Sequence, residues 1–381
     1  MSLVVETVTE IGRFAALRDD WERVNLECEA GSFFTSHDWL ATWCTWFLTA
    51  GTSLYILLVW RNESLLGIAP FVIRKEQSGI KWLYLLGTGE EEASEVASEY
   101  ADILVLPGAH LEVERVFADV MRKDASVWDG VQLLNVKSNS SVRPLLAGVL
   151  GRAAIRERLT GARYCVALRE YPSSDAYLAS LESSSFRNKL QVARRRMLKA
   201  GGDFIVVDTD SVDFDICYAD LVRLHNNRWR GKGGRGVFAD ASFAGFHRDL
   251  LRLPGPRSSA YLAVLALDGA PVAVLYLLVY RGECHFYQSG IDPTVTPNVS
   301  PGILAHYLAI EWAIRQGFTT YDFMKGGARE SYKQSFCRPG VNLYNYTMLR
   351  PRVGALLRYL AFTALNVISR IRWRSDKRCP A

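Results

Sequence analysis

The chain has 381 residues, of which 49% are apolar and 22% charged, and this ordinary globular composition excludes a disordered or fibrous protein. Its formal net charge of +5 is uneven: residues 350–381 hold eight basic residues and one acidic residue, so this end carries +7 and residues 1–349 carry −2. A body close to neutral with a basic end argues against a protein that binds nucleic acid over its whole surface.

In the first half, the hydrophobic pattern predicts a strand at residues 3–7, an amphipathic helix from residue 11 to residue 26, and an aromatic-rich helix over residues 37–48 that Thr35 or Ser36 caps. Apolar runs on either side of residues 61–64 predict a hairpin. The elements expected after it are, in order, strands at 82–86 and 103–106, a helix at 110–122, a strand at 131–136 and a helix at 142–150.

The second half repeats this order. Residues 261–267, a turn at Asp268 and Gly269, and residues 271–279 predict a second hairpin, which a strand, a helix at 301–316 and another strand follow. Tyr261 aligns with Tyr55 of the first hairpin, an offset of 206 residues. Hairpins are common and match by chance, but the shared order and spacing favour duplication of a whole α/β domain.

A turn over residues 171–175 marks the start of the second half, and Ser174 or Asp175 is suited to cap the next helix. Nothing nearby has the composition of a linker, so we expect the two halves to pack directly. The sequence therefore predicts domains at 1–165 and 166–349 and a basic tail at 350–381.

One predicted helix, bounded by a serine cap and by the pair Gly201 and Gly202, is strongly basic. Its residues 187–199 hold six basic side chains, including Arg187 and Arg195, and no acidic one. This is either a solvated face whose cations suit the helix C-terminus or a surface that binds a phosphate-bearing ligand.

Residues 221–238 run from a helix into a glycine-rich loop that lacks P-loop spacing. His225, Arg228 and Trp229 share one helical face by i,i+3 and i,i+4 spacing, so they are suited to contact an acceptor. The alternative is a structural histidine, which is the more common case for a lone helical histidine.

A strand that ends at residues 288–290 is followed by a loop and a helix with Ser300 at the N-cap and Pro301 at its first position. Backbone N–H groups at such a terminus suit a pyrophosphate, and the small Gly302 admits close approach. Every capped helix offers such groups, so this signal is weak by itself.

The last chemically informative segment is 318–336. Asp322 lies within an apolar strand, where a carboxylate needs a partner, and Lys325 and Lys333 are the candidates. Tyr332 is suited to protonate a leaving thiolate, and Lys333 to stabilise developing negative charge. The alternative is a structural ion pair beside a packed tyrosine.

Together these segments resemble the GNAT superfamily of acyl-CoA N-acyltransferases, and more narrowly the CelD/BcsL-type family, which is associated with bacterial exopolysaccharide production and shares a tandem-GNAT layout with the Fem transferases. The segments that carry the resemblance are residues 34–40, 185–196, 224–229, 267–273, 287–293, 300–302, 321–323 and 332–333. The implied fold is α/β with mixed sheets: two tandem GNAT-like domains, each a mostly antiparallel sheet flanked by helices.

The resemblance implies acetyl transfer from acetyl-CoA, without a metal, to an amine of a sugar or lipid-linked sugar precursor. With that family as a guide, the expected catalytic residues are Asp322, Tyr332, Lys333 and His225, with Asp322 or His225 assisting deprotonation of the amine. The expected cofactor contacts are Gln288, Ser289, Gly290, Ser300, Gly302 and Ile303. The expected acceptor contacts are Arg187, Arg195, Arg228 and Trp229.

The sequence departs from the superfamily's pyrophosphate loop, R/Q-x-x-G-x-G/A, because the matching segment offers only Ser300, Pro301 and Gly302, and proline removes one N–H. Fem-type relatives lack the same loop and use aminoacyl-tRNA. Two alternatives therefore stay open: aminoacyl transfer from charged tRNA, which the basic helix suits, and a non-catalytic scaffold of a polysaccharide-synthesis complex.

Seven scattered cysteines without C-x-x-C spacing predict reduced thiols in a cytoplasmic protein and no zinc site. The N-terminus lacks the order of a secretory signal, and no stretch reaches the roughly 18 apolar residues of a membrane span.

Residues 350–373 predict an amphipathic helix. It either packs on the second domain or associates peripherally with the anionic inner membrane.

Overall fold

The computed structural model describes residues 3–150, 155–253, 259–292, 294–295, 300–327 and 332–350. The strands of the first half are β1 (Leu3–Val8), β2 (Thr52–Arg61), β3 (Ser64–Lys75), β4 (Lys81–Leu85), β5 (Leu104–Val105) and β6 (Gly130–Lys137). The later strands are β7 (Arg156–Ala167), β8 (Asp203–Asp208), β9 (Ser259–Leu267), β10 (Ala270–Tyr280), β11 (Glu283–Ile291), β12 (Thr320–Gly326) and β13 (Pro339–Leu349).

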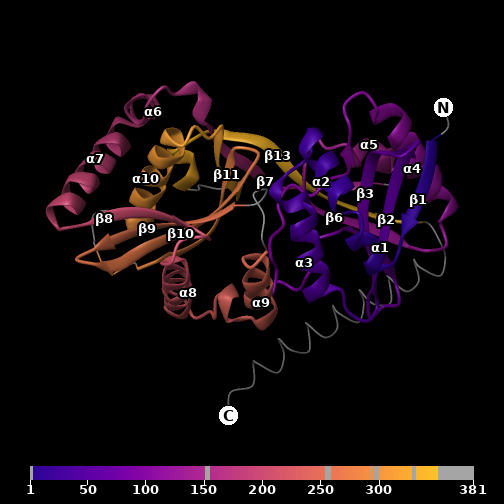
Figure 1. The fold of residues 1–381 in the computed structure, drawn as a ribbon, viewed down its shortest axis with the longest axis horizontal. Helices are drawn as coiled ribbons and strands as arrows, with labels where there is room; N and C mark the ends of the chain where they lie inside the picture. The colour runs from indigo at the N-terminus through magenta and orange to yellow at the C-terminus, as the bar shows by residue number, and fades with distance from the viewer. Residues whose placement is uncertain are drawn as a thin grey trace, which may run out of the picture.

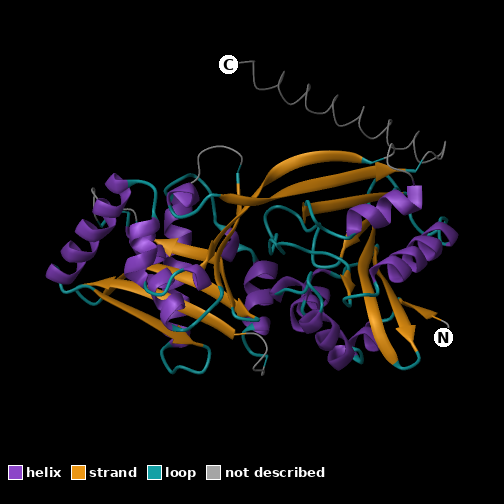
Figure 2. Ribbon diagram, turned by 90° about the horizontal axis from the view of Figure 1, so that it is seen from above, coloured by secondary structure: helices purple, strands orange, loops and turns teal. Residues whose placement is uncertain are grey.

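Helices lie on both faces of these strands (Figure 2). In the first half they are α1 (Ile11–Ala15), α2 (Arg18–Glu27), α3 (His37–Phe47), α4 (His110–Lys123) and α5 (Val142–Leu150). In the second half they are α6 (Ser174–Ser180), α7 (Ser184–Lys199), α8 (Phe214–Arg230), α9 (Ala241–Leu250) and α10 (Pro301–Arg315).

The described strands form one mixed sheet in the order β1-β2-β3-β4-β6-β13-β7-β12-β11-β10-β9-β8, with β5 beside β3. Neighbours are antiparallel except for two described pairs, β4 with β6 and β11 with β12. Each parallel pair follows a hairpin (β2–β3 or β9–β10) and is connected through a helix (α4 or α10). The structure thus confirms the repeated order and the fold class of two tandem α/β units with mostly antiparallel strands.

The C-terminal strand joins the two units. β13 pairs with β7 through Pro339–Thr347 and with β6 through Leu343–Leu349, so it runs from the second half into the first (Figure 1). Arg350 holds its end there, donating to the carbonyl oxygens of Met121 (3.0 Å) and Ala125 (2.6 Å). The chain therefore crosses between the halves twice in the sheet, and the predicted boundary at residues 165 and 166 falls within β7.

Buried side chains of both halves form a shared core, with Trp39 of α3 packed against Phe246 of α9 at a ring distance of 4.8 Å. Polar contacts reinforce it: Tyr280 donates to Glu22 (3.0 Å) and accepts from Asn25 (2.6 Å). The halves pack directly, as the absence of a linker-like segment predicts. Separate clusters bury the opposite faces, under α4 and α5 in the first half and under α6, α7 and α10 in the second.

The structure differs from the predicted elements at two places in this frame. The single helix predicted from residue 11 to residue 26 is broken into α1 and α2 at Leu17, because Leu17 leaves helical geometry (φ −88°, ψ 2°). The helix after the 171–175 turn is capped by Ser173, whose hydroxyl accepts from the Ala176 N–H at 3.1 Å, instead of Ser174 or Asp175. The amphipathic helix predicted at 350–373 lies, beyond Arg350, outside the described residues.

Candidate functional site

The parallel strands β11 and β12 pair over three residues only and then separate. Glu283, Cys284 and His285 pair with Thr320, Tyr321 and Asp322, and no pairing between these strands follows. At the same point β12 loses its register with β7, between Asp322 and Lys325. Met324 takes a left-handed backbone conformation (φ +61°), which is uncommon for a residue with a side chain. The bend opens a notch in the middle of the sheet.

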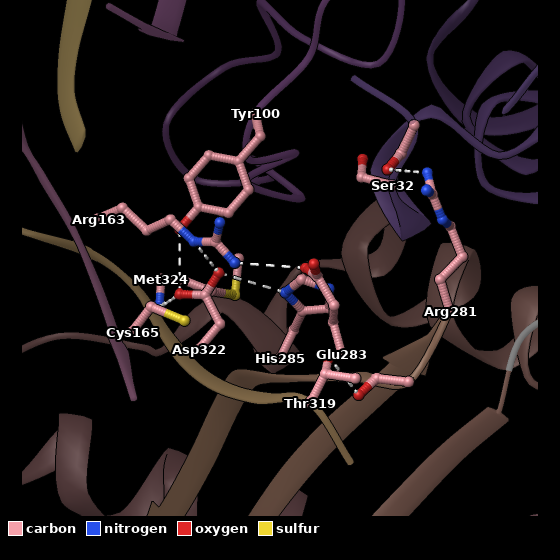
Figure 3. A network of polar contacts seen from close by, with 12 residues as sticks. Ser32, Tyr100, Arg163, Cys165, Arg281, Glu283, His285, Thr319, Asp322 and Met324 are labelled. Atoms are coloured by element: carbon pink, nitrogen blue, oxygen red, sulfur yellow. Dashed lines mark hydrogen bonds and ion pairs between the residues drawn. The ribbon is translucent and has the colours of Figure 1, made fainter. Parts of the chain in front are cut away.

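A buried polar network holds the point where the strands separate (Figure 3). Asp322 is fully buried, and its Oδ2 accepts from Arg163 Nε of β7 at 2.7 Å. Its Oδ1 accepts from the N–H of Met324 (2.7 Å) and from the hydroxyl of Tyr100 (3.2 Å). Arg163 also pairs with Glu283 of β11 at 3.3 Å. One carboxylate therefore caps the bend in β12 and connects three strands to a loop of the first half.

The charges of this network fix the protonation of Asp322. Burial by itself raises the pKa of this carboxyl, but the Arg163 charge and the neighbouring donors outweigh it and lower the pKa to about 2. The sequence predicts Lys325 or Lys333 as the partner, whereas the structure shows the ion pair with Arg163. Lys325 instead donates to Asn135 at 2.7 Å. A carboxylate held this strongly is a weak proton acceptor.

A cavity of about 240 Å³ lies in the notch. Its lining comes from β11, β12, the turn that carries Lys333, residues 237–243, and a loop of the first half. The lining residues are Glu92, Glu95, Ala97, Glu99, Val237, Phe243, Phe286, Tyr287, Gln288, Phe323, Met324, Lys325 and Lys333. Of the site residues expected from sequence, the structure brings Gln288 and Lys333 together here.

Glu99 lines the cavity but is not among the site residues expected from the sequence. Its buried position changes the pKa of its carboxyl group. It is 8% exposed, and its Oε2 has no hydrogen-bond partner in the described part of the chain. Burial raises the pKa of this carboxyl to about 8, although the charges of Lys325 and Lys333 act in the opposite direction. The acidic run from Glu90 to Glu99 is the sequence signal that points to this loop.

The loop over residues 88–103 is fixed by contacts with both halves. Tyr287 of β11 donates to the Val96 carbonyl oxygen (2.6 Å), and Trp39 donates to the Ser98 hydroxyl (2.8 Å). Tyr100, which donates to Asp322, has a left-handed backbone conformation (φ +61°). The first half thus contributes one wall of the cavity and holds it in place.

Lys333 and Tyr332 stand beside the cavity on a short 3-10 turn, Tyr332–Ser335. The Lys333 ammonium donates to the carbonyl oxygens of Phe323 (2.5 Å) and Lys325 (2.6 Å), and burial lowers its pKa. Tyr332 is 42% exposed, but its hydroxyl lies 3.2 Å from His306 Nε2, and desolvation around the hydroxyl raises the pKa of this phenol. Burial lowers the pKa of His306 to about 3, so its ring is neutral at physiological pH.

His225 lies on α8 and contacts β11 from the side. Its Nδ1 is 2.9 Å from the carbonyl oxygen of Ser289, and burial lowers the pKa of the ring. Trp229, one turn later, is 43% exposed and lies beneath the Lys232 ammonium at 5.6 Å. The face predicted from the spacing therefore runs from a buried histidine that fixes β11 to an exposed aromatic ring.

At Gly290, β11 and α8 approach each other closely. A Cβ there would lie 2.5 Å from the Leu221 carbonyl oxygen and 2.8 Å from Leu224 Cβ. We expect Gly290→Ala to lower the free energy of unfolding by about 1–3 kcal/mol, because a backbone atom cannot move aside. Urea titration measures this, with Gly12→Ala in open space on α1 as the control; equal stability of the two variants would contradict the packing described.

The N-terminus of α10 offers fewer donors than a diphosphate site needs. Pro301 has no N–H, and the N–H of Ile303 donates to the Ser300 carbonyl oxygen at 3.0 Å. Gly302 packs against Ile291, where a Cβ would lie 2.5 Å from Cδ1. Residues 293 and 296–299 of the preceding loop lie outside the described part. Two of the first three positions of the helix thus present no free N–H.

The four expected acceptor contacts, Arg187, Arg195, Arg228 and Trp229, are outside the cavity lining given above. On α7, Arg194 pairs with the buried Glu311 at 2.8 Å, and Arg187 donates to the Leu181 carbonyl oxygen. Arg195 and Arg196 are exposed. The basic helix therefore divides into side chains with structural partners and an exposed basic face.

A larger cavity, about 740 Å³, adjoins the turn that carries Lys333 and is lined by the end of β7, the α6–α7 connection and residues 334–338. It contains two thiols, Cys165 and Cys337, and burial raises the pKa of each to about 12. They stay protonated at neutral pH, so this cavity offers no thiolate nucleophile.

No described group of three or more His, Cys, Asp or Glu side chains is suited to hold a metal ion. Within the described ranges, helices long and apolar enough to cross a membrane do not occur.

Comparison with known families and structures agrees with this fold. Residues 184–334 match the family described as an acetyltransferase (GNAT) domain. The crystal structure of FemX aligns with a TM-score of 0.60 and 12% identity, over 94% of this chain and 99% of that chain. No curated protein sequence matches the chain.

Two further structures align over most of both chains. The structure of L-PGS from Bacillus licheniformis aligns with a TM-score of 0.53 and 15% identity, over 90% of this chain and 95% of that one. The C-terminal domain of a protein assigned as a lysylphosphatidylglycerol synthetase, from Agrobacterium fabrum, aligns with a TM-score of 0.53 and 10% identity, over 91% and 95%. At these identities the likeness shows the fold: a GNAT-type acyltransferase fold in a Fem-like tandem layout.

Proposed function

We propose that this chain is an N-acyltransferase whose acyl donor enters the notch between β11 and β12. The observation that carries the proposal is the separation of these two parallel strands after three residue pairs, with a cavity between them. Among the described strands, none pairs with the β12-facing edge of β11 beyond His285, so the backbone there is able to bind an extended donor arm along Gln288, Ser289 and Gly290.

The side chains around the notch suit direct attack of an amine on an ester or thioester carbonyl. Lys333 supplies a positive charge close to where the oxyanion forms, and Tyr332 is a protonated phenol that is suited to protonate the leaving group. Asp322 and His225 act through position: Asp322 fixes the bend of β12, and His225 holds the Ser289 carbonyl of β11. The group that accepts the proton of the amine is therefore a residue other than Asp322.

Acetyl-CoA is the first donor to test, because the second half matches an acetyltransferase domain. The proposed acceptor is an amine of a sugar or lipid-linked sugar in exopolysaccharide synthesis, which rests on the resemblance to the CelD/BcsL-type family. Calorimetric titration with acetyl-CoA tests the donor, and no binding up to the millimolar range would refute it. Mass spectrometry of the surface polysaccharide with and without the gene tests the acceptor.

The N-terminus of α10 favours a second candidate, aminoacyl transfer from charged tRNA. With Pro301 and Ile303 offering no free N–H, a diphosphate loses the donors on which acyl-CoA enzymes with a pyrophosphate loop rely. The exposed face of α7 supplies charge for a nucleic-acid backbone instead.

On this second reading, charged-tRNA binding weakens steeply with salt. We expect the double variant Arg195→Gln/Arg196→Gln to lower the slope of log affinity against log salt by about 1 to 2, since each phosphate contact contributes roughly 0.7–0.9. Fluorescence titration at several salt concentrations measures this slope. Lys123→Gln, on the exposed end of α4, is the control, and equal slopes for both variants would remove tRNA from consideration.

A scaffold without catalysis is the remaining alternative. Because Asp322 is a structural carboxylate, its replacement would confuse loss of fold with loss of chemistry. The variant Tyr332→Phe/Lys333→Met leaves the Asp322 network in place. Cells that make normal polysaccharide with this variant would support a scaffold over both enzymes.

A further inference from the structure

Carboxylates of the first-half loop line the cavity at increasing depth. Glu92 is exposed, Glu95 is half-buried and Glu99 is buried, and all three line the same 240 Å³ space. The loop that carries them is fixed to β11 through Val96 and to β12 through Tyr100. The second half therefore receives a negative path that leads from solvent to the notch.

The innermost carboxylate has an unused oxygen. Glu99 Oε2 is buried without a hydrogen-bond partner among the described residues, which is costly unless a ligand supplies one. The charged groups that act on Glu99 are Lys325 and Asp322 of β12, Lys333 of the following turn and Glu95 of its own loop. Lys325 and Lys333 already donate to Asn135 and to backbone carbonyl oxygens.

We propose that the acceptor of this site is a primary amine that enters as its ammonium ion, that Glu92 and Glu95 attract this cation, and that Glu99 accepts its proton. The inference rests on the proposed acyl transfer and adds the charge state in which the amine enters, the side chains that attract it and the group that takes its proton. It also assigns the catalytic proton acceptor to the first half of the chain, whereas the donor site lies in the second.

One N–H proton of the ammonium passes to the Glu99 carboxylate, which leaves a neutral amine with a free electron pair. That pair forms the C–N bond to the acyl carbon of the ester or thioester, and the bond from this carbon to the leaving oxygen or sulfur breaks. The leaving atom takes the bonding pair and the proton of the Tyr332 hydroxyl, and a second proton from nitrogen passes to the Tyr332 oxygen.

The same charges discriminate between acceptor classes. An acceptor with a phosphate beside its amine meets Glu92 and Glu95 before it reaches Lys333. The negative charges of the phosphate and of these carboxylates repel each other. A neutral hydroxyl gains nothing from the three carboxylates. The cavity therefore selects a cationic amine over both an anionic acceptor and an alcohol.

The first test is calorimetric binding of butylammonium to the full chain, with 1-butanol as a neutral probe of the same shape. We expect butylammonium to bind, and its affinity to rise about 10-fold between about pH 6 and pH 8 as Glu99 loses its proton. Glu99→Gln should abolish this pH dependence. Equal affinity for the two probes, or an unchanged pH dependence in Glu99→Gln, would overturn the proposal.

The exposed carboxylates provide a second test that does not disturb the core. The variant Glu92→Gln/Glu95→Gln should bind butylammonium about 5- to 10-fold more weakly, since two charges at the mouth are removed. Glu91→Gln, on the same loop and outside the lining, is the matched control and should bind as the wild type does. Equal weakening in the control would overturn the role of Glu92 and Glu95.

The outcomes also separate this inference from the proposed function. A chain that binds butylammonium through Glu99 but transfers no acyl group from acetyl-CoA or aminoacyl-tRNA refutes the transfer and leaves the cation site standing. A chain that acylates 1-butanol as well as butylamine confirms the transfer and refutes the cationic acceptor.

Discussion

Replacing Arg163 with methionine is expected to lower the free energy of unfolding by about 3–5 kcal/mol, because it leaves a buried charge without its partner. Asp322 is fully buried and Arg163 is its nearest cation, at 2.7 Å. Methionine keeps most of the volume of the arginine stem, so the loss reports the charge and not a cavity. Chemical denaturation monitored by tryptophan fluorescence measures the change.

The double variant Arg163→Met/Asp322→Asn is the control, and it should recover part of the loss because neither buried charge remains. The effect also depends on pH. In the wild type the pKa of Asp322 is about 2, below its unfolded value of about 3.9, so its stabilisation is present above about pH 4 and is lost as pH falls toward 2.

In Arg163→Met, burial without the arginine raises the pKa of Asp322 instead. The variant should then gain relative stability as pH falls and the carboxyl takes up a proton. A difference from the wild type that stays constant between about pH 4 and pH 7 would contradict this account of the network.

Local patterns were enough to predict most of the frame. Ser36 caps α3, and the two hairpins and their following helices lie where alternation and helical spacing place them. The basic helix begins after the Ser183 cap and ends before Gly201. These features depend on residues that are close in sequence, so a single sequence contains them.

The strands that join the halves were not predicted. β7 and β13 are half-exposed, interrupted by register shifts, and pair with each other across 175 to 191 residues of chain. Strand pairing at such separation depends on neighbours that a local window does not contain. Arg163 was missed for the same reason. It lies on an irregular strand, and nothing near it in the sequence indicates that the fold places Asp322 beside it.

Only part of the site was predicted, because a local pattern does not show which distant segments the fold brings together. Gln288 and Lys333 belong to the second-half segments that resemble the family, and both line the cavity. Glu99 comes from a loop of the other half, and only the docking of Val96 and Tyr100 on β11 and β12 brings it there. The tandem layout therefore provides more than two similar folds, because the first half supplies a wall that the second lacks.

Replacing Lys333 with methionine is expected to lower kcat by about 10²- to 10³-fold, because the Lys333 ammonium lines the cavity and is held there by two backbone carbonyl oxygens. Loss of a charge that acts mainly on the oxyanion changes kcat more than KM. Steady-state kinetics with the donor that binds in titration measures this. The control is Lys123→Met, an exposed lysine on α4, which should retain wild-type kcat.

The pH profile of Lys333→Met gives an independent check, because Lys333 also lowers the pKa of Glu99. Removing that charge raises the pKa of Glu99 further, so the residual activity of the variant should reach its plateau at higher pH than the wild type. A reduced kcat with an unshifted profile would mean that Lys333 and Glu99 do not act in one site. A kcat within about threefold of the wild type would remove Lys333 from the chemistry.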